Sequence, residues 1–162
     1  MLAVRYVALV ALVVWLGGMI VLGAVVAPST FRVLQASEAV AGRALAGAVF
    51  GDVLRHFHLV AYACGGVLIL CLIVQKLVGP PPSAFPVRLS IVALMLALDV
   101  YSGVVVSGEI ARVQSEVSGP ISSLPAGDPQ RSRFNQLHAR STTLMTIEMA
   151  LGLVLLFWYA RE

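Results

Sequence analysis

The sequence predicts an all-α integral membrane protein, built as an antiparallel, up-down four-helix bundle. Of its 162 residues, 59% are hydrophobic and only 12% are charged, and the mean hydropathy is +0.94. A soluble domain is typically about 45–50% apolar and about 25% charged. Crossing a hydrocarbon core of about 30 Å takes about 20 apolar residues per helix. Four stretches meet this requirement, and they are residues 2–27, 53–78, 87–108 and 141–160.

These spans account for most of the chain, so a single transmembrane domain is expected over residues 1–162. The first apolar run is longer than the roughly 7–15 residues of a signal-peptide core, which favours a retained helix over a cleaved signal. An even number of spans places both termini on one side. More basic residues lie in the two long connections, which favours placing those connections in the cytoplasm. The termini and the short loop have more basic residues per residue of chain, which favours cytoplasmic termini. The orientation therefore stays open.

The three connections differ in composition. Pro28 is expected to end the first span, and Ser37 to cap an amphipathic, small-residue helical segment that lies against the bundle or runs on into the second span. Within it, Gly47 and Gly51 have the small-xxx-small spacing that lets helices approach closely. Residues 79–86, GPPPSAFP, predict a tight turn, and SGPISSLPAGDP, within the third connection at residues 113–133, predicts an irregular loop. Asp128 followed by proline predicts a fourth helix that starts at residue 129, before the membrane.

Polar residues recur at helical spacing in three of the spans. Inside a bilayer such residues tend to face the bundle interior or a cavity, so the stripes are expected to meet in a polar interior that is charged at one end. The stripes are Gly51, Arg55, His58, Tyr62 and Gly65 in the second helix; Arg88, Met95, Asp99, Ser102 and Glu109 in the third; and Arg131, Phe134, His138, Ser141, Met145, Glu148 and Gly152 in the fourth.

The charged end of the interior is expected on the side of the two long connections. Arg55, His58 and His138 all lie near that membrane face by sequence position, where they could form one cluster, while His56 faces elsewhere. Two imidazoles from facing helices can ligate a haem iron or a transition metal, and Arg55 or Arg140 could then pair with haem propionates. The alternative is that the histidines bond carboxylates or carbonyls where helices cross.

Asp99 and Glu148 lie deeper, each about 10 Å or more from its nearer membrane boundary by helical rise. A lone charge at that depth costs several kcal/mol. We therefore expect at least one of them to be neutral, or to pair with the other or with an arginine. A functional interpretation is a proton or cation relay, and a structural interpretation is an interhelical hydrogen bond that fixes the helix register.

Other classes of function find little support in the sequence. The formal net charge is +3, but the basic residues are not interleaved with aromatics in a run, so the expected contacts are the lipid bilayer, other membrane subunits or a second copy, and not nucleic acid. Cys64 and Cys71 lie about 10 Å apart along one helix, too far for a disulfide. No phosphate-binding loop, GxSxG or HExxH occurs, and no catalytic residue is assigned.

Three stretches together resemble the bacterial relatives of the transmembrane protein 205-like family, which are small four-helix membrane proteins of largely unassigned function. They are WLGGMIVLGAVVAPSTFRVL at 15–34, AGRALAGAVFGDVLRHFHLVAYACGG at 41–66, and RFNQLHARST at 133–142. The resemblance implies a four-helix fold and a multi-pass protein of the bacterial inner, or cytoplasmic, membrane. It supplies no reaction.

Three functions are compatible with these observations. The first is a non-enzymatic accessory subunit of a membrane complex, or a small-solute handling protein, with a mostly structural polar interior. The second is a haem- or metal-binding protein with His58 and His138 as ligands. The third is a proton-coupled transporter with Asp99 and Glu148 as carriers, which for so small a unit would require an oligomer.

Overall fold

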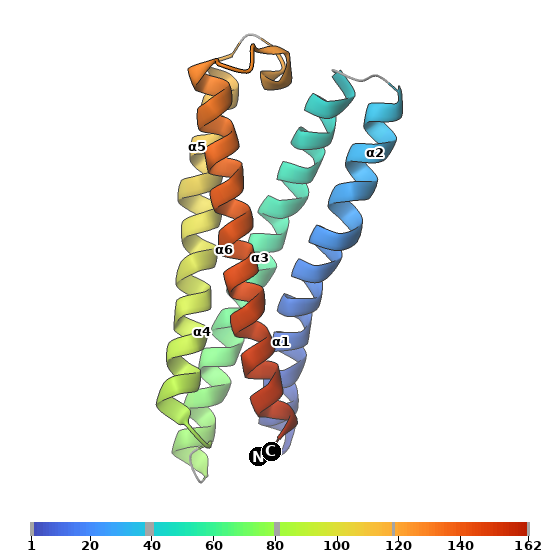
Figure 1. Cartoon of the computed structure of the whole chain (residues 1–162). Helices are drawn as coiled ribbons and strands as arrows, with labels where there is room; N and C mark the ends of the chain where they lie inside the picture. Colours follow the sequence, from blue (N-terminus) through green and yellow to red (C-terminus); the bar gives the residue numbers. More distant parts are fainter. Residues whose placement is uncertain (1, 38–40, 80–81, 118, 162) are drawn as a thin grey trace.

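The computed structural model describes residues 2–37, 41–79, 82–117 and 119–161. Over these residues every regular element is helical, and the helices form four long antiparallel rods with both termini at one end (Figure 1). All four rods are long and apolar enough to cross a membrane. The predicted all-α four-helix fold is therefore confirmed, and the chain is a multi-pass membrane protein.

Each rod is nearly continuous, although two contain a π-helical turn. The first consists of α1 (Leu2–Val21), the π-helical turn η1 (Leu22–Val26) and α2 (Ala27–Ser37), and the second is α3 (Ala41–Val78). The third consists of α4 (Phe85–Val100), the π-helical turn η2 (Tyr101–Val106) and α5 (Ser107–Ser115). After a connection with one 3₁₀ turn, η3 (Ile121–Ser123), the fourth rod is α6 (Pro129–Ala160).

The prediction that Pro28 ends the first helix is wrong. In η1 the N–H of Ala27 donates to the carbonyl of Leu22, five residues back, so the hydrogen-bond ladder has shifted just before the proline that lacks an N–H. The helix continues to Ser37, whose hydroxyl donates to the carbonyl oxygen of Leu34 at 2.9 Å. Ser37 therefore lies at the C-terminal end of α2 and does not cap the next helix.

The small-residue segment that was expected between the first two spans forms the first turns of α3. Residues 38–40, which precede α3, lie outside the described residues, as do Pro80 and Pro81 of the predicted turn. The predicted start of the fourth helix is confirmed. Asp128 Oδ1 accepts hydrogen bonds from the backbone N–H groups of Gln130, at 2.8 Å, and of Arg131, at 3.4 Å.

The rods are longer than a bilayer requires. They contain 36, 38, 31 and 32 residues, whereas residues 56–75, 89–108 and 141–160, which contain no lysine or arginine, are each about 20 residues long and suffice to cross it. The excess lies at the end away from the termini. There α2 packs on α3 and α5 packs on α6, and Figure 1 shows these two pairs diverging. We call them the α2–α3 arm and the α5–α6 arm.

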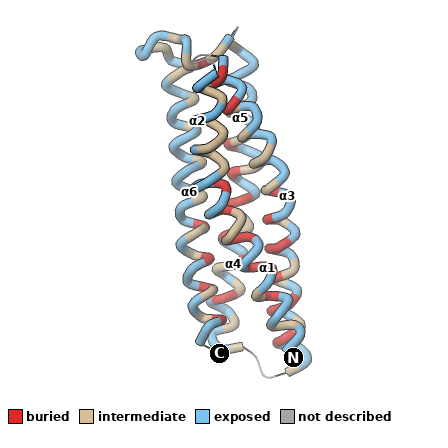
Figure 2. Tube along the Cα trace, turned by 90° about the vertical axis from the view of Figure 1, so that its right-hand side faces the viewer, coloured by how far each residue is buried: buried red, intermediate tan, exposed pale blue. Residues whose placement is uncertain are grey.

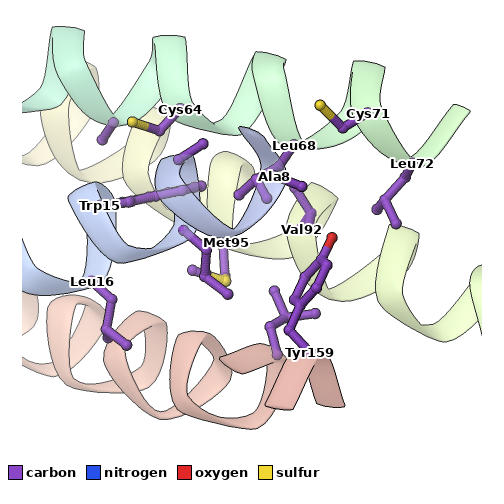
Figure 3. Close-up of a cluster of buried hydrophobic side chains, with 14 of the residues drawn as sticks. Ala8, Trp15, Leu16, Cys64, Leu68, Cys71, Leu72, Val92, Met95 and Tyr159 are labelled. Atoms are coloured by element: carbon purple, nitrogen blue, oxygen red, sulfur yellow. The ribbon is translucent and has the colours of Figure 1, made fainter. Parts of the chain in front are cut away.

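Burial is concentrated in the half of the bundle nearer the termini (Figure 2). Trp15 of α1, Leu68 of α3 and Met95 of α4 are 0% exposed, and Leu155 of α6 joins them in one apolar core (Figure 3). By contrast, no residue of α2 is buried, and α6 has no buried residue before Glu148. Buried residues are thus concentrated near the termini and sparse along the arms, where η3 contacts α3.

Candidate functional site

A buried imidazole and a buried carboxylate meet where the apolar core ends. His58 of α3 places Nδ1 2.8 Å from Oδ1 of Asp99 on α4, and the two side chains are only 8% and 4% exposed. Asp99 lies at the midpoint of residues 89–108, the stretch of the third rod without lysine or arginine, where an isolated charge is costly. Glu148 or an arginine was the expected partner of Asp99, and its hydrogen-bonding partner is His58, which agrees with the alternative prediction that the histidines bond carboxylates where helices cross.

The π-helical turn η2 brings α3 and the third rod together at this point. At Gly103 a Cβ atom would overlap the hydroxyl of Tyr62 and lie 2.9 Å from Cγ of His58. The rings of His58 and Tyr62 are stacked, with centroids 6.1 Å apart. Only glycine leaves room for both rings against the backbone of η2. Gly103 is therefore a residue of the site that was not predicted from the sequence. The pattern of residues around it does not indicate a π-helical turn.

A second buried carboxylate, Glu148 of α6, faces the same region. It is 3% exposed. Its helix packs on α4, which carries Asp99, and the hydroxyl of Tyr62 on α3 lies against Gly103 of η2. Ser102, one turn after Asp99, is also buried. We call His58, Tyr62, Asp99, Ser102 and Glu148 the polar cluster.

Two buried atoms of the polar cluster have no hydrogen-bond partner among the described residues. They are Nε2 of His58 and Oδ2 of Asp99. A buried polar atom without a partner costs about 1–3 kcal/mol, more when the group is charged. In native proteins such atoms are rare, and each one requires an explanation such as a catalytic role, a water or an ion.

His138 does not join His58. It is exposed on α6, and its ring stacks on that of Phe134, with centroids 6.3 Å apart and planes inclined by 6°. Arg55, which was expected beside His58, is exposed and pairs with Asp52 at 2.9 Å. Arg140 is also exposed, and its guanidinium lies 3.4 Å from the hydroxyl of Tyr101. Of the expected cluster of Arg55, His58 and His138, the structure therefore buries His58 alone and leaves the other two exposed with different partners.

The stripe of the third helix is buried as predicted at four positions: Arg88 and Met95 are 0% exposed, Asp99 3% and Ser102 5%. Ser141 of the fourth helix is half-buried, one of the partly covered side chains between the cluster and the arms. Arg88 lies at the opposite end of the bundle from the arms. Its guanidinium donates to the hydroxyl of Ser83 at 3.0 Å and lies 5.3 Å from the ring centroid of Tyr159.

The donor set bears on the predicted metal site. Within the described ranges, no group of three or more His, Cys, Asp or Glu side chains is placed to hold a metal ion. Cys64 and Cys71 are free and buried, in agreement with the prediction that they form no disulfide. The arrangement offers a hydrogen-bonded imidazole–carboxylate pair, a second carboxyl and two hydroxyls.

The comparisons with known proteins identify a family but no activity. Residues 10–118 match the family described as a domain of unknown function, DUF4149. The match includes His58 and Asp99, whereas Glu148 lies beyond it. No curated protein and no solved structure matches the chain. The resemblance to the transmembrane protein 205-like family is not confirmed under that name. Because the matched residues make up more than half of the sequence, the chain belongs to the DUF4149 family.

Proposed function

We propose that the protein binds and releases protons at the polar cluster and couples this to the movement of a small solute across the membrane. The carrying observation is the buried contact of 2.8 Å between His58 and Asp99, with the carboxyl of Glu148 buried beside it. Imidazole and carboxyl groups inside a bilayer are the usual components of proton relays in pumps and transporters.

The third ionisable group favours this function over a purely structural one. An interhelical hydrogen bond that fixes register needs two partners, and His58 and Asp99 supply both. Glu148 adds a second buried carboxyl from α6, which the hydrogen bond between His58 and Asp99 does not require. Proton exchange best explains why a carboxyl that is costly at this depth, and that the hydrogen bond between His58 and Asp99 does not require, is present.

Proton flux into liposomes tests the proposal. Vesicles that contain the reconstituted protein and a trapped pH-sensitive dye are given a potassium diffusion potential. We expect protein-dependent acidification that is lost in Asp99→Asn and in Glu148→Gln. Glu109→Gln is the matched control, because Glu109 pairs with Arg133 outside the stretches that lack lysine and arginine. Flux equal to that of empty vesicles, or unchanged flux in both cluster variants, would contradict the proposal.

A haem or transition-metal site is the second candidate, favoured by one observation. Nδ1 of His58 is held by Asp99 while Nε2 is buried and unpartnered among the described residues, which is how metal-ligating histidines are commonly oriented. His138, the predicted second ligand, is exposed. Oxidised and reduced absorption spectra and metal analysis of the purified protein test this candidate. A Soret band or stoichiometric metal that is lost in His58→Ala supports it, and a clear spectrum without metal contradicts it.

A role as an accessory subunit is supported by the small-residue face at the start of α3. A Cβ atom at Gly47 or Gly51 would meet nothing within 4 Å, so this spacing serves no contact within the chain. Small-xxx-small faces favour contact between membrane helices. Purification from native membranes in mild detergent tests the role. A stoichiometric partner that is lost in Gly47→Ile and kept in Gly66→Ile supports it, and a protein that purifies alone contradicts it.

A further inference from the structure

The polar cluster contains more acidic groups than basic ones. Asp99 and Glu148 contribute two carboxyls, and His58 is the only basic side chain among its members. The buried residues of α1 and η1 are all apolar. Arg140 contacts the exposed Tyr101, and Arg88 lies three turns from Asp99 along α4, about 16 Å away. When both carboxyls are ionised, one negative charge is therefore left without a cation among the described residues, even if His58 is protonated.

An unpartnered oxygen points to where a cation would bind. The side chain of Asp99 is 4% exposed, and its Oδ2 has no partner among the described residues, although Oδ1 is held by His58. The buried carboxyl of Glu148 lies on α6, which packs on α4, and the hydroxyl of Tyr62 lies at Gly103 of η2. These are all oxygen donors, which suit hard cations.

The charge and the donor set distinguish between classes of cation. Sites for divalent ions in proteins usually combine several carboxylates or imidazoles, and the described part of the chain has no cluster of three or more His, Cys, Asp or Glu side chains that could hold one. One uncompensated negative charge is neutralised by one monovalent ion. A proton on Glu148 achieves the same neutrality, so the cation and the proton would compete.

The burial pattern gives the direction from which an ion reaches the cluster. On the side of the termini, a Cβ atom at Gly152 would lie 3.2 Å from Leu16 and 3.4 Å from Met95, so the helices there are packed without space between them. On the side of the arms, the neighbours of Glu148 along α6 are half-buried Met145 and Ser141. Met145 Cε also lies 3.4 Å from the Cβ position of Gly23 in η1, so this side is covered too, but only by half-buried side chains, and we take it as the side from which water and ions reach the cluster.

We propose that the carboxylates of Asp99 and Glu148 bind a small monovalent cation that enters between the α2–α3 and α5–α6 arms and replaces a proton. This inference rests on the proposed function and names the ion that the same site exchanges. Sodium, potassium and ammonium share the required chemistry, and the experiment distinguishes them.

Carbodiimide labelling of the reconstituted wild-type protein tests the inference. A hydrophobic carbodiimide reacts with a protonated carboxyl in an apolar environment, so Glu148 is expected to be labelled at acidic pH, as located by mass spectrometry. Sodium, potassium or ammonium chloride is then added, with choline chloride at equal ionic strength as the control. A cation at about ten times its dissociation constant leaves about one tenth of the sites free, so labelling slows about tenfold. The most effective of the three identifies the ion.

The variants separate the cation site from the proton site. Asp99→Asn should keep the label on Glu148 but lose the protection by cations, whereas Glu109→Gln should behave as wild type. Equal labelling rates in all four salts would overturn the cation site while the proton site stands. Absence of labelling on Glu148 at every pH would overturn both. In vesicles of uniform orientation, protection by cations added only on the side of the termini would overturn the proposed route.

Discussion

The contact between His58 and Asp99 provides the sharpest test of the structure. At 2.8 Å and an effective dielectric constant of about 20, two opposite charges attract by about 6 kcal/mol before desolvation is subtracted. Removing one partner of such a buried pair costs about 3–5 kcal/mol, because the other is left buried alone, whereas replacing both by apolar residues is often neutral. His58→Leu and Asp99→Leu should each destabilise the fold, and the double variant should be at least about 3 kcal/mol more stable than additivity predicts.

The buried cysteines supply the assay. Cys64 and Cys71 are 8% and 7% exposed, so a thiol-reactive fluorogenic dye reports their exposure as the protein unfolds on heating in detergent. At about 2–4 °C per kcal/mol for a chain of this size, each single variant should lower the melting temperature by about 6–20 °C. As a control, the exposed pair Arg133 and Glu109 should contribute less than about 1 kcal/mol. Single variants that melt like wild type, or a double variant equal to the sum of the two, would refute this reasoning.

Four further substitutions probe the backbone with the same thermal assay. Gly42→Ala should lower the stability by about 1–3 kcal/mol, because its Cβ would overlap a backbone carbonyl of α2. Gly47→Ala, with nothing within 4 Å of the added Cβ, should raise the stability by about 0.5–1 kcal/mol. Equal changes in melting temperature for the two variants would contradict the close approach of α2 and α3. Gly103→Ala should cost about 1–3 kcal/mol and change carbodiimide reactivity in the polar cluster, and unaltered reactivity would show that η2 does not position it. Asp128→Ala should cost about 0.5–2 kcal/mol and increase hydrogen exchange only in the first turn of α6, so exchange that spreads along the helix would count against a local cap.

The spans and the start of α6 could be predicted because their causes are local. A run of about twenty apolar residues predicts a span over that same run, and an aspartate followed by proline predicts the start of a helix at that position. Pro28 was misinterpreted because its missing N–H is accommodated by the shifted ladder of η1, and no residue pattern in the sequence indicates that shift.

The polar cluster could be predicted only in part. Burial of Asp99, Ser102 and Glu148 follows from their depth in the spans. His138 was misplaced because steps of three and four accumulate error. At about 100° per residue, its distance from Glu148 along α6 leaves it about 80° away from the direction of Glu148. The pairing of His58 with Asp99 depends on how α3 and α4 are offset along their axes, which is set by packing between helices and not by either sequence alone.

Both termini lie at the end of the bundle that contains the packed apolar core, so the side of the membrane on which one terminus lies also gives the side of that core. A reporter fused to either terminus therefore reports the same compartment (Figure 1). The packed core around Trp15 and Met95 separates this compartment from the polar cluster. Under the proposed route between the arms, locating one terminus therefore also identifies the compartment with which the cluster would exchange ions: it is the one on the opposite side of the membrane.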